Sequence, residues 1–433
     1  MVAIFQGSPL SGGDVVKRKR LQNLQSLSAN IDRVGGVFPK LAATLPTIGA
    51  AAAATAIATG TTWQAYMGGA VQDAAKFTLI GGLWGPHGPT FPNNQIGSAI
   101  VANQGNGADN TFGPGYSGRA RFMLAAPSFE LYLQTVVAAG GNGCRLKVDG
   151  EYVKDGTFAT DGNGLIRFYP VTWGAGAAAD RKMRCYELEM NGCRFLGIRT
   201  TNLYKPAPWP VAGGLRVIQH GDSFVETVVD AGNKDNAKYG STGKAIPQLL
   251  GQPDYWPSGT GGAGWFSPTN HLQSWFNDRV SLNIASQLPD VVIDHGGGND
   301  EAVLTSGAVT QAQYEAAVTT WVQTVIATNP AVQIFMTGPL IAGSGTALGH
   351  IRCRDWKKNV ASRFPENVAF IDNLLDPWVF GTGREGALTA DGNKDWVCGS
   401  DGAHPTVDGH AYLAQRVVLG VARAIPALVA ANS

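Results

Sequence analysis

The second half of the chain alternates short apolar runs with segments of helical spacing. The apolar runs have the β-branched composition of buried strands and are GLRVIQ (214–219), LPDVVIDHG (288–296), VQIFMTG (332–338) and NVAFID (367–372). The helical segments are 311–328, 350–364 and 408–425. Alternating strands and helices build a mostly parallel sheet with helices on both faces, so this half predicts an α/β domain. Ligands of such sheets bind beyond the carboxyl ends of the strands.

Residues 61–205 carry a second pattern, in which β-branched and aromatic runs are separated by glycine-rich turns. The turns are GGNG at 140–143, DGNG at 161–164 and NG at 191–192. Short strands at this spacing predict a β-sandwich. The prolines of KPAPWP (205–210) favour extended backbone and indicate a stiff linker. We therefore expect a β-sandwich at 61–205 and the α/β domain at 206–433.

Residues 1–60 are expected to form a helical, Ala-rich appendage. After the basic run KRKR (17–20), apolar residues recur at near-helical spacing: Leu21, Leu24, Leu27, Ile31 and Val34. Such a segment suits a solvated helix or one that joins copies of the chain, for example as a homotrimer. The uncharged stretch 41–60 has the length of a membrane span, but it is mostly Ala, Thr and Gly and contains Pro46. We therefore expect an Ala-rich helix or linker there and no membrane span.

The first residues, 1–11, lack the basic start and apolar core of a signal peptide, so none is expected. Cellular location stays open at this point, with extracellular action and a virion-associated location both compatible with the sequence.

Charge and cysteine content exclude several classes of protein. Lys and Arg total 33 and Asp and Glu total 32, a formal charge of +1 that does not suit binding along a nucleic-acid backbone. No C-x-x-C pair predicts a structural zinc site. One disulfide within the β-rich stretch stays open among Cys144, Cys185 and Cys193.

Four clusters of unusual residues lie next to the predicted strands and the last helix. They are His220-Gly221-Asp222-Ser223, the glycine cluster 259–265, Gly296 to Asp300, and Asp401-Gly402-Ala403-His404. Each cluster alone resembles an ordinary turn or helix cap. All four together, in this order, predict one reactive site at the carboxyl edge of the sheet.

The residue types in these clusters suit nucleophilic catalysis. Ser223 needs a base to remove its proton, and His404 can be that base. Asp401 would accept the other imidazole N–H and orient the ring. A tetrahedral oxyanion would receive hydrogen bonds from the Ser223 backbone N–H, a glycine N–H and the Asn299 amide. This chemistry requires neither a metal nor an organic cofactor.

These clusters resemble the signature blocks of the SGNH (GDSL-type) hydrolases, and the resemblance covers about 213–428. It implies a flavodoxin-like three-layer α/β/α domain with Ser223, Asp401 and His404 as catalytic residues. The G-x-x-G spacing of the second block points to Gly262 as an oxyanion donor, with Gly264 as the fallback. The third block is Gly297-x-Asn299-Asp300, with Asn299 as a donor. Phe224 replaces the leucine of Gly-Asp-Ser-Leu, at a position expected to pack rather than react.

A β-sandwich followed by this hydrolase domain resembles carbohydrate esterase family two and similar polysaccharide deacetylases, whose first domain is jelly-roll-like. The resemblance implies a serine esterase that removes acetyl groups from a carbohydrate or acts on another small ester. Further residues are expected to contact the substrate: Asp222, Gly264, Trp265 and His295.

Three alternatives remain from the sequence. One is a lipase or thioesterase of the same family. Another is a phage-tail-like attachment protein that carries a hydrolase domain. The last is a metallophosphatase using the histidines and aspartates near the strand ends: His220, Asp222, Asp294, His295 and Asp300.

Overall fold

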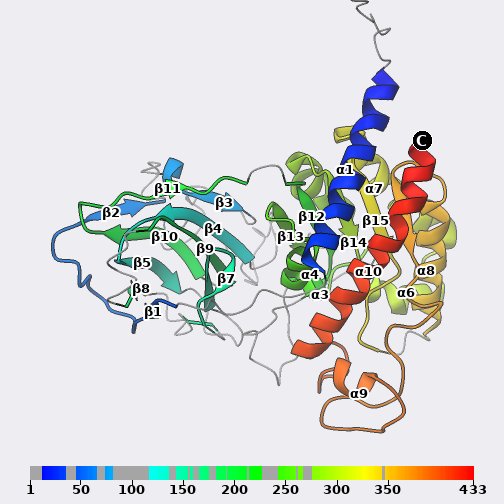
Figure 1. Ribbon diagram of the computed structural model, residues 1–433. Coiled ribbons are helices and arrows are strands. Elements are labelled where there is room, and N and C mark those ends of the chain that lie inside the picture. Colours follow the sequence, from blue (N-terminus) through cyan, green and yellow to red (C-terminus); the bar gives the residue numbers. More distant parts are fainter. Residues whose placement is uncertain are drawn as a thin grey trace, which may run out of the picture.

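The computed structural model describes residues 12–35, 45–65, 74–80, 117–135, 143–154, 157–158, 165–174, 182–191, 193–211, 214–226, 242–259, 262–266, 276–343 and 347–433. Antiparallel sheets occupy one side of the molecule, and a parallel sheet with its helices occupies the other (Figure 1).

Five parallel strands form the sheet of the second half. They are β12 (Val217–Gly221), β13 (Tyr255–Gly259), β14 (Val291–Asp294), β15 (Gln333–Thr337) and β16 (Val368–Ile371). Their order is β13-β12-β14-β15-β16, which is the flavodoxin-like order, and a binding crevice of such a sheet lies where β12 adjoins β14. The predicted parallel sheet is confirmed. The sequence pattern does not predict β13, because Pro257 and Gly259 interrupt it, and proline is tolerated there because β13 is an edge strand.

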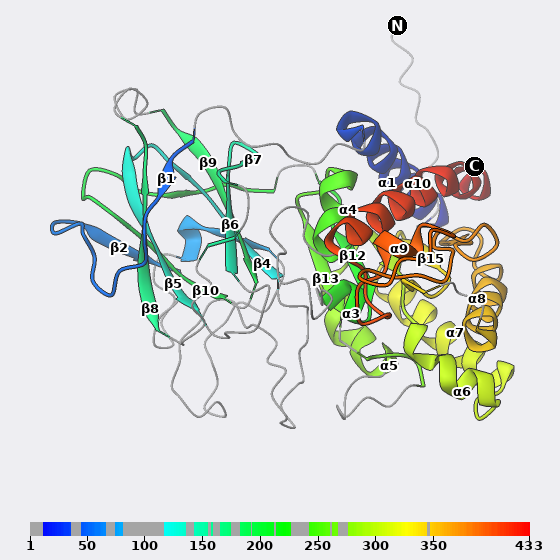
Figure 2. The same cartoon turned by 90° about the horizontal axis from the view of Figure 1, so that it is seen from below.

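Helices cover both faces of this sheet (Figure 2). The longer ones are α1 (Gly12–Val34), α4 (Thr242–Leu250) and α10 (Val407–Asn432) on one face, and α7 (Gln311–Thr328) and α8 (Leu348–Ala361) on the other. Val217 and Ile218, neighbours on β12, belong to the cores on opposite faces, as the two-residue period of a strand requires. The shorter helical pieces are α3 (Ser223–Glu226), α5 (Phe276–Arg279), η2 (Val280–Ile284), η3 (Ala285–Gln287), η4 (Gly298–Asp300), α6 (Glu301–Ser306) and α9 (Lys394–Val397).

Helix α1 differs from the expected appendage, because it packs into the α/β core beside α4 and α10 (Figure 2). Leu24 and Leu27 are fully buried there. Arg20, from the basic run, is also buried and binds Glu366 at 2.6 Å and the Pro330 carbonyl at 2.9 Å. The apolar stripe that suggested contacts between chains is thus used within one chain.

Helix α10 is, among the described helices, the one long and apolar enough to cross a membrane. In this structure it is a core helix, with Leu413, Val417 and Val421 fully buried in the cluster beneath α1 and α4.

The β-rich part contains two antiparallel sheets. One has the order β1 (Thr47–Ile48), β8 (Ile166–Thr172), β5 (Ser128–Thr135), β10 (Cys193–Thr200) and β2 (Thr61–Gln64). The other has β11 (Ala207–Pro208), β4 (Ser117–Leu124), β9 (Arg184–Asn191), β6 (Gly143–Val148) and β7 (Glu151–Tyr152), with β3 (Thr78–Ile80) beside β4 and the short helix η1 (Ala74–Lys76) before it. Both sheets contribute to one buried cluster, where the ring of Phe129 lies 5.8 Å from Phe122 and 4.9 Å from Tyr186.

The expected boundaries at 60 and 205 shift for a physical reason. Within the stretch 41–60, β1 pairs with β8, so the Ala-rich segment supplies an edge strand rather than a helix. Residues 36–44 lie outside the described part. In the expected linker, β11 pairs with β4. Sequences of low hydrophobicity can form an edge strand, because the backbone alone makes the hydrogen bonds. A search for apolar periodicity does not detect such strands.

A row of charged side chains joins the β-rich part to the α/β part. Lys147 lies between Glu187 and Glu189, at 3.2 and 2.6 Å, and all three side chains are buried. Arg119 donates to the carbonyls of Pro253 (2.8 Å) and Tyr255 (3.0 Å) across the interface. The Lys147 ion pairs thus lie within the β-rich part, and Arg119 links that part to the α/β part through two backbone carbonyls.

Candidate active site

The structure brings Ser223, His404 and Asp401 together. His404 Nε2 lies 2.9 Å from Ser223 Oγ, and His404 Nδ1 lies 2.7 Å from Asp401 Oδ2. Ser223 begins α3 just after β12, at the carboxyl edge of the sheet. The arrangement is that of a nucleophile, a base and a group that orients the base.

The turn before α10 holds Asp401 and His404 in place. Asp401 Oδ1 accepts the backbone N–H groups of Ala403 (2.8 Å) and His404 (2.9 Å), which leaves Oδ2 for the imidazole. Burial opposes ionisation of Asp401, but these N–H groups and His404 lower its pKa below the ordinary value. Thr406 then caps α10 by accepting the Gly409 N–H. The local sequence therefore presents an ionised carboxylate to His404.

Asp222, expected at the substrate, instead has its carboxyl group buried inside the turn. It is 3% exposed, and its Oδ1 accepts the Phe224 N–H at 3.2 Å. Burial raises the pKa of Asp222 to about 7. Phe224 is also buried and its ring lies 6.0 Å from that of His404, so it packs as expected from the sequence.

The glycine loop and the third block are bound to each other. Asn299 Nδ2 donates to the Ala263 carbonyl at 3.0 Å, and Asp300 accepts the N–H groups of Trp265 and Phe266. A Cβ on Gly264 would lie 2.1 Å from Asp300 Oδ1, so this contact requires glycine. An amide has two N–H donors, of which this contact uses one. Gly262, the residue before Ala263, has a φ of +71°. Residues 260–261 lie outside the described part.

Two of the residues expected at the substrate are core residues. Trp265 is 1% exposed and packs against Phe276 with ring centroids 4.8 Å apart, so its face is not available to a sugar. His295 is also 1% exposed, and burial lowers its pKa to about 3. His295 directly follows β14 and Trp265 follows the glycine loop, and both side chains lie in the interior.

A buried lysine that sequence reasoning missed, Lys357, lies beneath this edge. Asp294 pairs with Lys357 Nζ at 2.7 Å and with His220 Nδ1 at 2.8 Å. Burial would raise the pKa of Asp294, but Lys357 and His220 lower it to about 2. Lys357 lies four residues after Cys353 and three before Val360, both buried. A lysine on the apolar stripe of a helix was the available signal.

These contacts bear on the metallophosphatase alternative. Both oxygens of Asp294 are engaged by Lys357 and His220. Within the described residues, no group of three or more His, Cys, Asp or Glu side chains is arranged to hold a metal.

Of the cysteines, those with described side chains are free thiols: Cys144, Cys185, Cys353 and Cys398.

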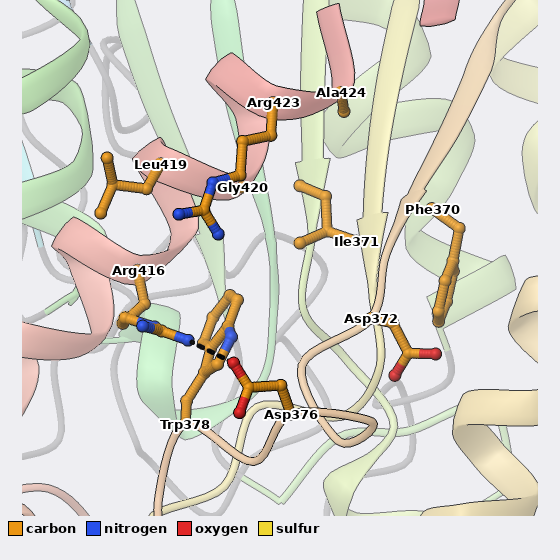
Figure 3. A pocket seen from close by; sticks show the side chains of 10 residues that line it. All are labelled: Phe370, Ile371, Asp372, Asp376, Trp378, Arg416, Leu419, Gly420, Arg423 and Ala424. Carbon is orange, nitrogen blue, oxygen red and sulfur yellow. Dashed lines mark ion pairs between the residues drawn. The ribbon is translucent and has the colours of Figure 1, made fainter.

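A hollow of about 270 Å³ lies at the end of β16 beside α10 (Figure 3). Trp378, Arg416, Arg423 and Asp376 line this hollow. Arg416 pairs loosely with Asp376 at 3.7 Å. None of the three residues of the Ser–His–Asp group lines it.

Comparison with known proteins finds likeness in structure rather than in sequence. No family model and no curated protein matches the chain. A carbohydrate esterase family 2 enzyme with a carbohydrate-binding domain, from Corynascus thermopiles (Myceliophthora fergusii), matches with a TM-score of 0.52 and 19% identity, over 81% of this chain and 99% of that one. A family two carbohydrate esterase from Clostridium thermocellum, in complex with cellohexaose, matches with a TM-score of 0.51 and 16% identity, over 72% and 94%.

The chain shares the fold of these esterases. An acetyl xylan esterase from Butyrivibrio proteoclasticus also matches, with a TM-score of 0.50 and 15% identity, over 83% of this chain and 97% of that one. The resemblance to the SGNH hydrolases is confirmed at the level of the fold. The matched share is larger than the α/β half alone, so the esterase fold includes part of the β-rich region.

Proposed function

We propose that the protein is a serine esterase that works through an acyl-enzyme. The observation that carries this proposal is the position of His404 between Ser223 Oγ (2.9 Å) and Asp401 (2.7 Å). The esterases of the same fold support it.

In the first half of the reaction, Ser223 Oγ attacks the ester carbonyl carbon while His404 Nε2 takes its proton. The oxyanion receives hydrogen bonds from the backbone N–H groups of Ser223 and Gly262 and from the Asn299 amide. The tetrahedral intermediate then collapses. His404 gives its proton to the leaving alcohol oxygen, and the acyl group stays on Ser223.

In the second half, a water molecule attacks the acyl carbonyl and His404 takes the water proton. Collapse returns that proton to Ser223 Oγ and releases the carboxylic acid. Asp401 stays ionised throughout and stabilises the imidazolium. All proton transfers are thus made by this chain's own side chains, without a cofactor.

The proposed substrate is an O-acetylated carbohydrate. Support comes from the neighbours of the same fold, which include an acetyl xylan esterase and an esterase seen with cellohexaose. The near-zero formal charge, +1, gives no attraction to nucleic acid. A jelly-roll-like β-sandwich beside the hydrolase domain would then form one side of the glycan-binding region.

A lipase or thioesterase would use the same Ser–His–Asp group, and acyl-chain length separates it from a deacetylase. An attachment protein that carries this domain remains compatible with deacetylation, because a virion-borne deacetylase would be both. Its homo-oligomer would need surfaces other than the α1 face that contains Leu24 and Leu27.

The deciding experiment compares hydrolysis of p-nitrophenyl acetate and p-nitrophenyl octanoate by the wild type and by Ser223→Ala. We expect Ser223-dependent turnover that prefers acetate, followed by acetate release from acetylated polysaccharides. Preference for octanoate would favour the lipase or thioesterase. Full turnover by a folded Ser223→Ala variant would overturn the serine esterase.

A further inference from the structure

Lys357 is a fully buried lysine on α8. Its Nζ lies 2.7 Å from Asp294 Oδ2 and donates to the Gly296 carbonyl at 2.9 Å. It also lies 5.0 Å from the centre of the Trp265 ring. A buried lysine is costly unless it is paired and hydrogen-bonded, so this position demands a reason.

The partners of Lys357 belong to two segments of the site, the end of β14 with the turn after it and the residues that follow the glycine loop. Asp294 ends β14 and holds His220 on β12, three residues before the serine. Gly296 opens the turn that leads to Asn299. Trp265 adjoins the glycine loop, which Asp300 and Asn299 hold through its backbone. The ammonium group therefore contacts the turn that leads to Asn299 and the residue that adjoins the glycine loop, and it reaches β12 only through the Asp294–His220 pair.

The turn from Gly296 to Asn299 depends on such support. Gly297 has a φ of +110°, and a Cβ there would lie 2.6 Å from Cys353 Sγ, so the turn packs tightly against α8. His350, two turns before Lys357 on α8, hydrogen-bonds the backbone of Gly298. Helix α8 thus holds the turn at two points, and Lys357 provides the charged one.

We propose that Lys357 is a positioning residue for the oxyanion site, acting through the Gly296 carbonyl on the turn that carries Asn299. This inference rests on the proposed serine esterase. Hydrogen-bond donors stabilise a transition state only when they are held in advance at the place where charge develops. Loss of Lys357 should therefore lower kcat without changing KM, because ground-state binding does not use the oxyanion donors.

The test is Lys357→Met, which keeps the length of the side chain and removes its charge. We expect kcat on p-nitrophenyl acetate to fall about 10- to 100-fold at unchanged KM, since removal of one oxyanion donor costs about 10²–10³-fold. The rate of labelling by a fluorophosphonate, which forms a tetrahedral adduct on serine, should fall in parallel.

Two lysines serve as matched controls. Lys358→Met changes the next residue on α8, whose side chain is 54% exposed, and should leave kcat unchanged. Lys147→Met breaks another buried ion pair, in the β-rich part, and should lower the melting temperature but not kcat. If Lys147→Met lowered kcat as much as Lys357→Met, lost stability would explain both and the proposal would be wrong.

A second variant covers failure of Lys357→Met to fold. Asp294→Asn with Lys357→Met removes both members of this ion pair, so that neither charge is left buried without the other. It should show the same selective loss of kcat. Wild-type kcat in this folded variant would overturn the role of Lys357, whereas activity retained in Ser223→Ala would overturn the serine esterase itself.

Discussion

His404 Nε2 lies 2.9 Å from Ser223 Oγ, although 181 residues separate them along the chain. The contact joins the end of β12 to the turn before α10. Those two elements are brought together by the core that α10 shares with the sheet. The reactivity of Ser223 is therefore a property of the packed α/β domain.

Replacement of Asp401 should impair the site less than replacement of Ser223. Asp401→Ala removes the acceptor for His404 Nδ1 and the two backbone contacts of the turn. We expect kcat to fall about 10²–10⁴-fold, since orienting carboxylates contribute on that order. Steady-state kinetics with p-nitrophenyl acetate measure this. Loss equal to that of Ser223→Ala would show that His404 cannot act without Asp401.

Asn299→Ala should lower kcat about 10²–10³-fold with little change in KM, because it removes an oxyanion donor. The substitution also breaks the hydrogen bond to Ala263, which holds the glycine loop. Thr305→Ala, on the neighbouring exposed helix α6, provides a control of similar size. A rise in KM alone would assign Asn299 to ground-state binding instead.

Asp222 should make stability depend on pH. Burial raises its pKa to about 7, from 3.8. Between pH 4 and 7 the native state then holds a proton that the unfolded chain has lost, so stability falls as pH rises through this window. The Asp222→Asn variant cannot ionise at this position. The difference between its free energy of unfolding and that of the wild type should therefore be a few kcal/mol more favourable to the variant at pH 8 than at pH 4. Thermal melts of both proteins across this range measure the difference, and parallel curves would contradict it.

Leu27→Ala should destabilise the α/β domain by about 2–5 kcal/mol, the usual cost of emptying a buried leucine position. The reason is that Leu27 is fully buried in the cluster shared with α4 and α10. Val15→Ala, on the same helix but 53% exposed, should change stability by less than about 0.5 kcal/mol. Denaturant unfolding measures both, and equal effects would mean that α1 does not dock as described.

Much of the α/β half was predictable, because its strands are buried on both faces and read as continuous apolar runs. The predicted helix at 311–328 coincides with α7. Strand β13 was not predictable from its pattern, because an edge strand tolerates Pro257 and needs less apolar surface. Helix α1 showed the correct period, but periodicity does not say against which surface an apolar stripe packs.

The site divides in the same way. Ser223, His404, Asp401 and Asn299 were predictable because their chemistry is carried by short motifs next to strands. The burial of Trp265 and His295 was not predictable, because both kinds of side chain occur at surfaces and in cores. The role of Lys357 was not predictable for a similar reason. Lys358 beside it is chemically identical, and the two differ only in the face of α8 on which they lie.

The sequence alone thus indicated the parallel sheet, the four motifs at its edge and Ser223, Asp401 and His404 as one candidate group, since local apolar periods and residue types encode these. Tertiary structure decided that α1 belongs to the core, that β1 and β11 extend the antiparallel sheets, and that Lys357 of α8 forms an ion pair with Asp294. These relationships depend on which surfaces meet after the chain has collapsed. Burial and pairing are properties of that meeting, and no stretch of sequence contains both partners.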